Sequence, residues 1–256
     1  MQFVFDLDGT ICFKGRPISE PLVLAIDKLI AAGHDVIFAS ARPIRDMMPV
    51  VHEKYRGRLW IGGNGSLASG GGAAEHVHAF PAEQLEQILQ LIRQHEATYL
   101  IDSDWDYAYT GAADHPILNN LDTLGLARNV ALESLERIVK VLILTASDIE
   151  SLNEKLLALD VVVHRHGNER ILDISPQNVH KWTALQKAGV QPKQFVAFGN
   201  DANDISMFRE ALHSVRIGEH PGLGEYASDS IPLEGDYESD IVRKIEELAV
   251  QYAAVR

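Results

Sequence analysis

Two carboxylates near the N-terminus are the residues with the clearest chemical potential. Asp6 and Asp8 follow the apolar run Phe3–Phe5 and precede Gly9 and Thr10. This pattern predicts a buried strand that ends at the acids, and ligands bind at that edge of open α/β sheets. Two neighbouring acids repel each other, so a site that keeps both needs a proton or a cation between them, and we expect magnesium. The alternative is a simple turn, because Asp and Gly are common turn residues.

Three further polar segments are expected at strand ends or helix starts of the same sheet. Ser40 follows the apolar run 36–39, Lys181 begins a predicted helix, and the acidic run, residues 199–204, follows the apolar run 195–198. A hydroxyl, an ammonium and acidic groups around a nucleophilic carboxylate are what phosphoryl transfer requires. Taken singly, Ser40 also suits a helix N-cap, Lys181 a solvated surface and the acidic run a capping turn.

The elements that must position these residues alternate between strands and helices. Before residue 70 the pattern predicts a helix from Ser19–Pro21 to Gly33, a strand at 36–39, a helix from Ile44 to about Tyr55 and a strand at 59–61. After residue 178 it predicts helices at 179–188, 205–210 and 239–252 and a strand at 195–198. This alternation predicts a doubly wound parallel α/β sheet.

The middle of the chain, residues 78–177, has a different rhythm that begins after the glycine run 70–72. Its apolar spacing predicts helices near 85–92 and 152–156 and strands near 99–101, 139–144, 161–163 and 171–174. We therefore expect an inserted α+β domain of one sheet and two helices, with residues 1–77 and 178–256 forming the core.

Composition and charge narrow the function classes. The formal net charge of -13 argues against nucleic acid or an anionic membrane as a partner. The single cysteine, Cys12, excludes an internal disulfide, and without a nearby histidine base it fits a buried apolar position better than a nucleophile. The chain shows no signal segment and no long apolar span, so we expect a cytoplasmic protein, either a monomer or a small homo-oligomer.

Taken together, these residues resemble the four motifs of the haloacid dehalogenase (HAD) superfamily of phosphatases, over essentially the whole chain. Residues 6–10 match the first motif without a gap, and the order hydroxyl, insertion, lysine, acidic run is reproduced. An insertion of about a hundred residues between the second and third motifs resembles the type IIB cap of the Cof-like subfamily. The runs Ile174–Pro176 and Asn203–Met207 are similar to that subfamily in detail. The resemblance implies a Rossmann-like HAD core with an inserted cap.

The resemblance also implies a role for each matching residue. Asp6 would form an aspartyl-phosphate, and Asp8 would act as general acid and then as general base. Ser40 would donate to a phosphoryl oxygen, while Lys181 would offset negative charge. The residues implied to contact substrate are Ser40, Ala41, Arg42, Asn64, Lys181 and Asn203. Magnesium would be held by Asp6, the main-chain carbonyl of Asp8, and the acidic run through Asn200 or Asp201 together with Asp204.

One residue departs from the pattern of the family, and it leaves both the metal ligand and the function with more than one possible assignment. Asn200 stands where the family usually has aspartate, so either its amide oxygen binds the metal or Asp201 substitutes. We expect a phosphatase acting on a small phosphorylated metabolite, a sugar phosphate above all. The alternatives are a phosphomutase, which returns the phosphoryl group to a sugar, and a non-catalytic protein that binds a phosphorylated ligand, which Asn200 motivates.

Other clusters predict less chemistry. Two histidine pairs at alternate positions, His76 with His78 and His164 with His166, fit solvated strand faces better than transition-metal sites. A run of alternate aspartates resembles the start of a calcium loop, but the glycine and glutamate that such a loop needs are replaced by Tyr107 and Ala113. A place on a cap surface facing the site stays open for Trp105, Tyr107 and Arg170, and no contact is assigned to any of them.

Overall fold

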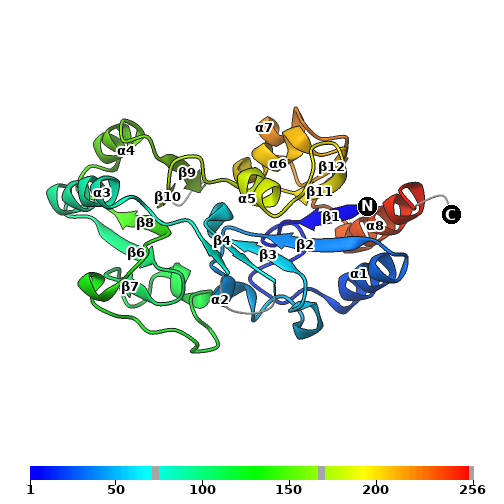
Figure 1. The fold of residues 1–256 in the computed structure, drawn as a ribbon, viewed down its shortest axis with the longest axis horizontal. Helices are drawn as coiled ribbons and strands as arrows, with labels where there is room; N and C mark the ends of the chain where they lie inside the picture. The colour runs from blue at the N-terminus through cyan, green and yellow to red at the C-terminus, as the bar shows by residue number, and fades with distance from the viewer. Residues whose placement is uncertain (71–74, 167–170, 254–256) are drawn as a thin grey trace.

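The computed structural model describes residues 1–70, 75–166 and 171–253, so Arg170 and two glycines of the run 70–72 lie outside the described residues. Two separate sheets organise this part of the chain (Figure 1). Its eight-stranded sheet has the order β13-β12-β11-β1-β2-β3-β4-β5, and its five-stranded sheet has the order β7-β6-β8-β10-β9.

The larger sheet is the expected doubly wound core. Among the described residues its six parallel strands are β1 (Gln2–Phe5), β2 (Asp35–Ala39), β3 (Leu59–Gly62), β11 (Phe195–Gly199), β12 (His213–Ile217) and β13 (Asp229–Ile231). One edge is extended by two antiparallel strands, β4 (Leu67–Ser69) and β5 (His76–Val77). The sequence pattern indicated neither of these strands, and it did not indicate β12 or β13.

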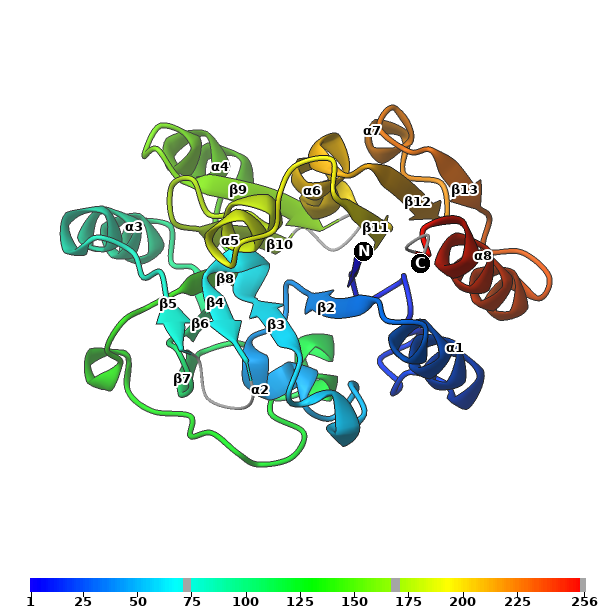
Figure 2. The same ribbon diagram turned by 45° about the vertical axis from the view of Figure 1, so that its right-hand side comes forward.

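Helices cover both faces of the core sheet (Figures 1 and 2). On one face α1 (Glu20–Ala31) packs beside α8 (Tyr237–Gln251), and their apolar side chains share a buried cluster with β1 and β2. The other face carries α5 (Lys181–Lys187), α6 (Ile205–Glu210) and α7 (Pro221–Gly224). Burial of both faces explains why the core strands read as nearly continuous apolar runs.

The second predicted helix is wrong in its extent. Instead of running from Ile44 to Tyr55, the chain forms the short α2 (Ile44–Met47), followed later by a 3-10 turn at Glu53–Tyr55. Pro49 explains the break, because a proline has no N–H to donate and its ring clashes with the carbonyl of the preceding helical turn.

The smaller sheet forms the cap, which we define as residues 78–177. Its strands are β6 (Thr98–Asp102), β7 (Tyr107–Tyr109), β8 (Lys140–Thr145), β9 (Val162–His166) and β10 (Ile171–Ser175). On one face α3 (Ala82–Gln94) and α4 (Ile149–Leu157) bury side chains such as Ile101 and Val141. Because neighbouring strand residues face opposite sides, Leu100 and Leu142 lie on the other face of this sheet. That face lines the pocket between cap and core that is described below. The strand β7 was not anticipated.

Several residues of the clusters that predict less chemistry have structural roles. The aspartates of the apparent calcium loop pair with three different arginines, Asp102 with Arg45, Asp104 with Arg137 and Asp106 with Arg128. His78 lies 3.2 Å from the ammonium of Lys187, and Cys12 is buried. Within the described ranges, we find no helix with the length and apolar character needed to cross a membrane.

A buried ionic cluster joins the cap to α2 of the core. The fully buried Arg45 guanidinium donates to the Asp102 carboxylate and, at 2.6 Å, to the main-chain oxygen of Trp105. It also lies 3.3 Å from the carboxylate of Asp46, which accepts a hydrogen bond from the main-chain N–H of Asp122 at 2.8 Å. Because buried charges are costly unless they are paired, these contacts tie the position of the cap to that of α2.

Replacing Arg45 with methionine tests this cluster. The Arg45→Met variant keeps the side-chain length but leaves two buried carboxylates, Asp46 and Asp102, without their cation. We expect the free energy of unfolding to fall by roughly 3–5 kcal/mol, measured by urea denaturation at neutral pH. The control is Arg128→Met, whose side chain is 81% exposed and whose loss should change stability by less than about 1 kcal/mol. Equal effects of the two substitutions would contradict the role of the cluster.

Candidate active site

The site lies at the carboxyl ends of three neighbouring strands. Asp6 follows β1, Ser40 follows β2, and the acidic run continues from the last residue of β11. Because β1 pairs in parallel with both β2 and β11, the three segments leave the same edge of the sheet. The structure therefore brings together residues that the sequence separates by up to two hundred positions.

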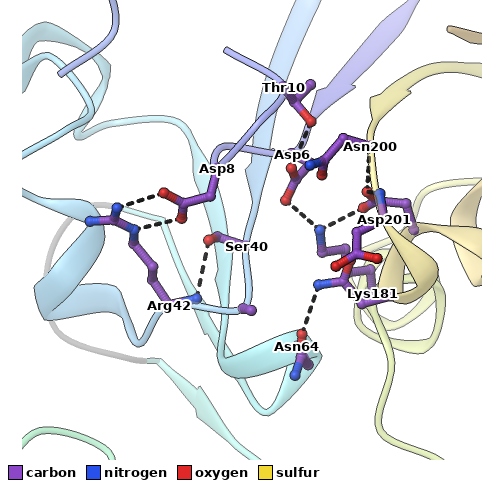
Figure 3. A network of polar contacts seen from close by, with 12 residues as sticks. Asp6, Asp8, Thr10, Ser40, Arg42, Asn64, Lys181, Asn200 and Asp201 are labelled. Atoms are coloured by element: carbon purple, nitrogen blue, oxygen red, sulfur yellow. Dashed lines mark hydrogen bonds and ion pairs between the residues drawn. The ribbon is translucent and has the colours of Figure 1, made fainter. Parts of the chain in front are cut away.

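Lys181 connects the acids at the centre of the site (Figure 3). Its ammonium donates to Oδ1 of Asp6 and to Oδ1 of Asp204, both at 2.6 Å, and all three side chains are buried. Lys181 is the first residue of α5, and the preceding His180 caps that helix through a reciprocal pair of hydrogen bonds with Thr183. The helix start thus fixes where the ammonium lies.

The charges of Lys181, Asp6 and Asp204, which we call the trio, do not sum to zero when both acids are ionised. Burial raises the pKa of Asp6 to about 7, against the lowering effect of Lys181, because an ionised carboxylate is poorly solvated there. Burial alone would lower the pKa of Lys181, but the charges of Asp204 and Asp6 outweigh it and raise that pKa. Thr10 donates its hydroxyl to Oδ2 of Asp6 at 2.7 Å. When both acids are ionised the trio carries one uncompensated negative charge, which favours a bound proton or cation.

Asp204 holds the acidic run in place. Its Oδ2 accepts hydrogen bonds from the main-chain N–H groups of Asn200 at 2.8 Å and Asp201 at 3.1 Å. Gly199 makes this possible, because a Cβ atom at that position would lie 2.6 Å from Cγ of Asp204. With Lys181 on its other oxygen, the Asp204 carboxylate is fully engaged in organising the loop.

Asn200 and Asp201 differ in where their side chains lie. The Asn200 amide lies beside Asp6 (Figure 3) and against Gly9, where an added Cβ would come within 2.1 Å of its Nδ2. The Asp201 carboxylate instead accepts from the main-chain N–H of Ala202 at 2.7 Å and caps its own turn. Of the two residues, Asn200 is the one placed to act together with Asp6.

Asp8 is paired with Arg42 rather than with Asp6. The guanidinium donates from Nε to Oδ2 and from Nη2 to Oδ1, both at 2.6 Å, and Figure 3 shows Asp8 turned toward Arg42. The buried Ser40 hydroxyl lies beside Asp8 in the figure and accepts from the main-chain N–H of Arg42 at 3.1 Å. The side chain of Asp8 is 47% exposed, and its pairing with Arg42 is therefore open to solvent.

A pocket of about 560 Å³ opens between the core and the cap beside Asp8 and Arg42. Its charged and polar lining includes Lys14, Asp46, Asp102, Asn120 and Lys140, and its apolar lining includes Leu100, Ile117, Leu121, Leu142 and Ile171. Most of these residues belong to the cap. The motifs that mark the core site therefore give no information about them. Trp105 does not line this pocket, and its main-chain oxygen accepts from Arg45.

Asn64 and Asn203 meet each other at the other side of the site. Asn203 donates from Nδ2 to Oδ1 of Asn64 at 3.1 Å, and Asn64 donates from Nδ2 to Oδ2 of Asp173, also at 3.1 Å. Lys140 lies 3.0 Å from the same Asp173 oxygen and donates to the main-chain oxygen of Ala41 at 2.8 Å. Sequence reasoning missed Asp173 and Lys140, although the run 174–176 marked the strand on which Asp173 lies.

The donor chemistry beside Asp6 fits magnesium. A carboxylate and an amide oxygen are hard ligands of the kind that this ion prefers over the nitrogen and sulfur ligands of transition metals. The uncompensated charge of the trio is a second observation in favour of a cation. In residues 1–70, 75–166 and 171–253, no three His, Cys, Asp or Glu side chains are grouped to hold a metal by themselves. An ion here would therefore need amide, main-chain or water oxygens as well.

Comparison of the sequence with known proteins identifies its family. The family model described as haloacid dehalogenase-like hydrolase matches residues 3–224. A curated relative is 5-amino-6-(5-phospho-D-ribitylamino)uracil phosphatase YitU of Bacillus subtilis (strain 168), which is 23% identical over 228 residues that cover 83% of this chain and 84% of that protein.

Solved structures resemble the whole chain. The HAD subclass IIB sugar phosphatase BT4131 superposes with a TM-score of 0.77 at 17% identity and covers 97% of this chain and 99% of its own. A haloacid dehalogenase-like hydrolase from B. subtilis gives a TM-score of 0.77 at 15% identity, with coverages of 96% and 99%. A haloacid dehalogenase-like hydrolase from Bacteroides thetaiotaomicron gives 0.74 at 19% identity, with coverages of 96% and 98%. At these identities the likeness shows the fold, with its core and type IIB cap.

Asp46, which lines the pocket, makes stability depend on pH. Burial raises the pKa of Asp46 to about 6, against the lowering effect of Arg45, from an ordinary value of 3.8. The folded protein therefore holds this proton more tightly, and the resulting stabilisation is present below about pH 4 and lost as pH rises through about 6. Asp46→Asn keeps an acceptor for the Asp122 N–H and should remove this contribution. The difference in unfolding free energy between wild type and variant should change from pH 4 to pH 6 and level off above about pH 7, whereas parallel curves would contradict the assignment.

Proposed function

The chain belongs to the haloacid dehalogenase-like hydrolase family, and we propose that it is a magnesium-dependent phosphatase that hydrolyses a small phosphorylated metabolite through an aspartyl-phosphate on Asp6. The observation that carries this proposal is the Lys181 ammonium, which lies 2.6 Å from both Asp6 and Asp204. A buried cation at this position offsets the negative charge that a phosphoryl group brings to a carboxylate nucleophile.

In the first step an oxygen of Asp6 attacks phosphorus while the bond from phosphorus to the ester oxygen breaks. Asp8 gives its proton to that departing oxygen, so the leaving group departs as a neutral alcohol. This role requires Asp8, whose pairing with Arg42 is open to solvent, to turn from Arg42 toward the ester oxygen. Thr10 and Lys181 hold the two Asp6 oxygens and orient the carboxylate for attack.

In the second step a water molecule attacks phosphorus and the bond between phosphorus and Asp6 breaks, which releases inorganic phosphate. Asp8 takes the proton from that water, so it is protonated again for the next turnover. Ser40, the main chain at Ala41, Arg42 and Lys181 would bind the phosphoryl oxygens throughout both steps.

A magnesium ion would be held by Asp6, the main-chain carbonyl of Asp8 and Asn200, and when bound it would neutralise part of the phosphoryl charge. We assign Asp204 to the organisation of the acidic run, because its oxygens already accept from Lys181 and from two main-chain N–H groups.

The lining of the pocket beside Asp8 supports our proposal for the substrate class. Charged groups such as Asp46 and Lys140 suit the hydroxyls of a sugar or polyol, while apolar side chains such as Leu142 suit its C–H faces or an attached ring. The name of the curated relative YitU describes a phosphorylated ribityl chain joined to a uracil ring, which combines both features. We therefore propose sugar and polyol phosphates as the substrates to test first.

Trapping the covalent intermediate tests the nucleophile. With an aryl phosphate, whose leaving group needs no proton, Asp8→Asn should still transfer the phosphoryl group but should hydrolyse it slowly. Intact-protein mass spectrometry after acid quenching should then detect one added phosphoryl group on Asp8→Asn and none on the double variant Asp6→Asn/Asp8→Asn. Asp6→Asn alone should lower phosphate release by at least about 1000-fold while circular dichroism stays unchanged.

The same assay separates the alternatives. Undiminished activity in Asp6→Asn would refute the nucleophile. A phosphomutase would transfer the phosphoryl group to a second sugar hydroxyl without net phosphate release. Absence of release from an aryl phosphate with magnesium, in a normally folded wild type, would favour a protein that only binds phosphorylated ligands.

The metal assignment predicts opposite results for two neighbouring residues. Asn200→Asp adds a carboxylate beside Asp6 and should lower the magnesium concentration for half-maximal activity by about tenfold. Asp201→Asn retains an oxygen to accept from the Ala202 N–H and should leave that concentration within about twofold of wild type. A higher magnesium requirement in Asp201→Asn, with no change in Asn200→Asp, would assign the metal to Asp201 instead.

A further inference from the structure

We propose that Asp173 and Asn64 are positioning residues that couple the seating of the cap to the order of the acidic run. In this view the phosphoryl site is fully organised only when the cap lies on the core. The part of this inference that concerns catalysis rests on the proposed phosphatase function, while the part that concerns the acidic run does not.

A row of hydrogen bonds, buried at its cap end, leads from the cap to the acidic run. Asp173, on cap strand β10, accepts from Asn64 Nδ2, and Asn64 Oδ1 accepts from Asn203 Nδ2, each at 3.1 Å. Asp173 is fully buried and only 1% of Asn64 is exposed. Water is therefore a poor substitute partner for Asp173 and Asn64, and the acceptor that Asn64 offers to Asn203 depends on how the Asn64 amide is turned.

The chemistry of Asp173 sets the direction of the whole row. An ionised carboxylate only accepts hydrogen bonds, so the amide of Asn64 must turn its NH2 group toward the cap. This leaves the Asn64 oxygen facing Asn203, which must then donate. If Asp173 moved away with the cap, nothing in the row would distinguish the two orientations of the Asn64 amide, and one of them offers Asn203 no acceptor.

The backbone of the loop that carries Asn64 cannot shift to compensate for a turned side-chain amide. Asn64 has a left-handed backbone, with φ of 59°, in the turn that follows β3. Its neighbour Gly65 packs so closely against α5 that a Cβ atom would lie 2.6 Å from the main-chain oxygen of His180. The main-chain N–H of Asn64 donates to the oxygen of Ser40 at 3.1 Å. Since the backbone is fixed at both sides, the side-chain amide is the part that can respond to the cap.

A second contact from the same aspartate reaches the loop after β2. Lys140, which lies 3.0 Å from Asp173, donates to the main-chain oxygen of Ala41, next to Ser40. Asp173 thus holds a cap lysine against the segment that would bind phosphoryl oxygens, and it also orients Asn64 toward the acidic run. The same carboxylate serves two loops of the site.

Exchanging the two residues tests the coupling. Asn64→Asp keeps an acceptor for Asn203 and suits the left-handed backbone, which aspartate tolerates, but it places two carboxylates against each other. Asp173→Asn removes the charge that orients the row. In the double variant Asn64→Asp/Asp173→Asn the amide at 173 donates to the carboxylate at 64, which also accepts from Asn203, so the row is restored with its charge moved by one position.

We expect the single variants to be impaired and the double variant to recover. With an aryl phosphate and saturating magnesium, kcat should fall about 30- to 100-fold in Asn64→Asp and about tenfold in Asp173→Asn. The double variant should be no slower than Asp173→Asn alone, because the row is restored while Lys140 still lacks the carboxylate at position 173. In parallel, hydrogen–deuterium exchange of peptides covering residues 199–207 should accelerate in the single variants and recover in the double variant.

The control is Asp106→Asn, a cap aspartate whose partner Arg128 is exposed, and it should leave both measurements unchanged. Additive losses in the double variant, or unchanged exchange in Asn64→Asp, would overturn the proposal. Thermal unfolding of each variant identifies any that fail to fold. If the wild type lacks phosphatase activity but the exchange pattern follows the expected order, the proposed function fails while the coupling stands.

Discussion

The ammonium of Lys181 between Asp6 and Asp204 is the interaction on which the rest of the site depends. It joins segments that are 175 and 23 residues from it along the chain. Because the three side chains are buried, a charged group that is displaced from its partner is not solvated by water. Unpaired buried charges cost several kcal/mol, whereas paired ones are close to balanced. The surrounding structure meets that requirement through the Thr10 hydroxyl, the main-chain N–H groups of Asn200 and Asp201, and the helix start at His180.

Several polar contacts join the cap to the core near the site. Arg45 with Asp102 forms one of them, and Asp173 with Asn64 and Lys140 with the main-chain oxygen of Ala41 form others. Such contacts are specific in geometry, yet their groups regain hydration when the two parts separate, so they contribute little net free energy to keeping them together. An apolar interface of the same size would favour the closed arrangement more strongly. A polar interface therefore suits a pocket that has to admit a substrate and release two products.

The fold was predictable from sequence where a long apolar pattern carried the information. The strands that contain Phe3–Phe5 and Val36–Ala39 and the helices that contain Ile26, Ile88 and Ile241 follow such patterns. Prediction failed for the helix after Ile44, because the local pattern continues past Pro49 whereas the helix ends before it. It also missed short strands at the sheet edges, such as His76–Val77 and Asp229–Ile231, because two or three residues are too few to show a period.

The sequence by itself determined which chemical groups leave the carboxyl edge of the core sheet, because strand ends and helix starts have local signals and the motif residues stand directly beside them. Only the tertiary structure decided which of those groups face one another. It placed Asn200 rather than Asp201 beside Asp6, turned Asp8 toward Arg42, and brought Asp173 of the cap to Asn64. These choices depend on contacts between residues far apart in the chain and on the direction in which each hydrogen bond donates, and local spacing encodes neither.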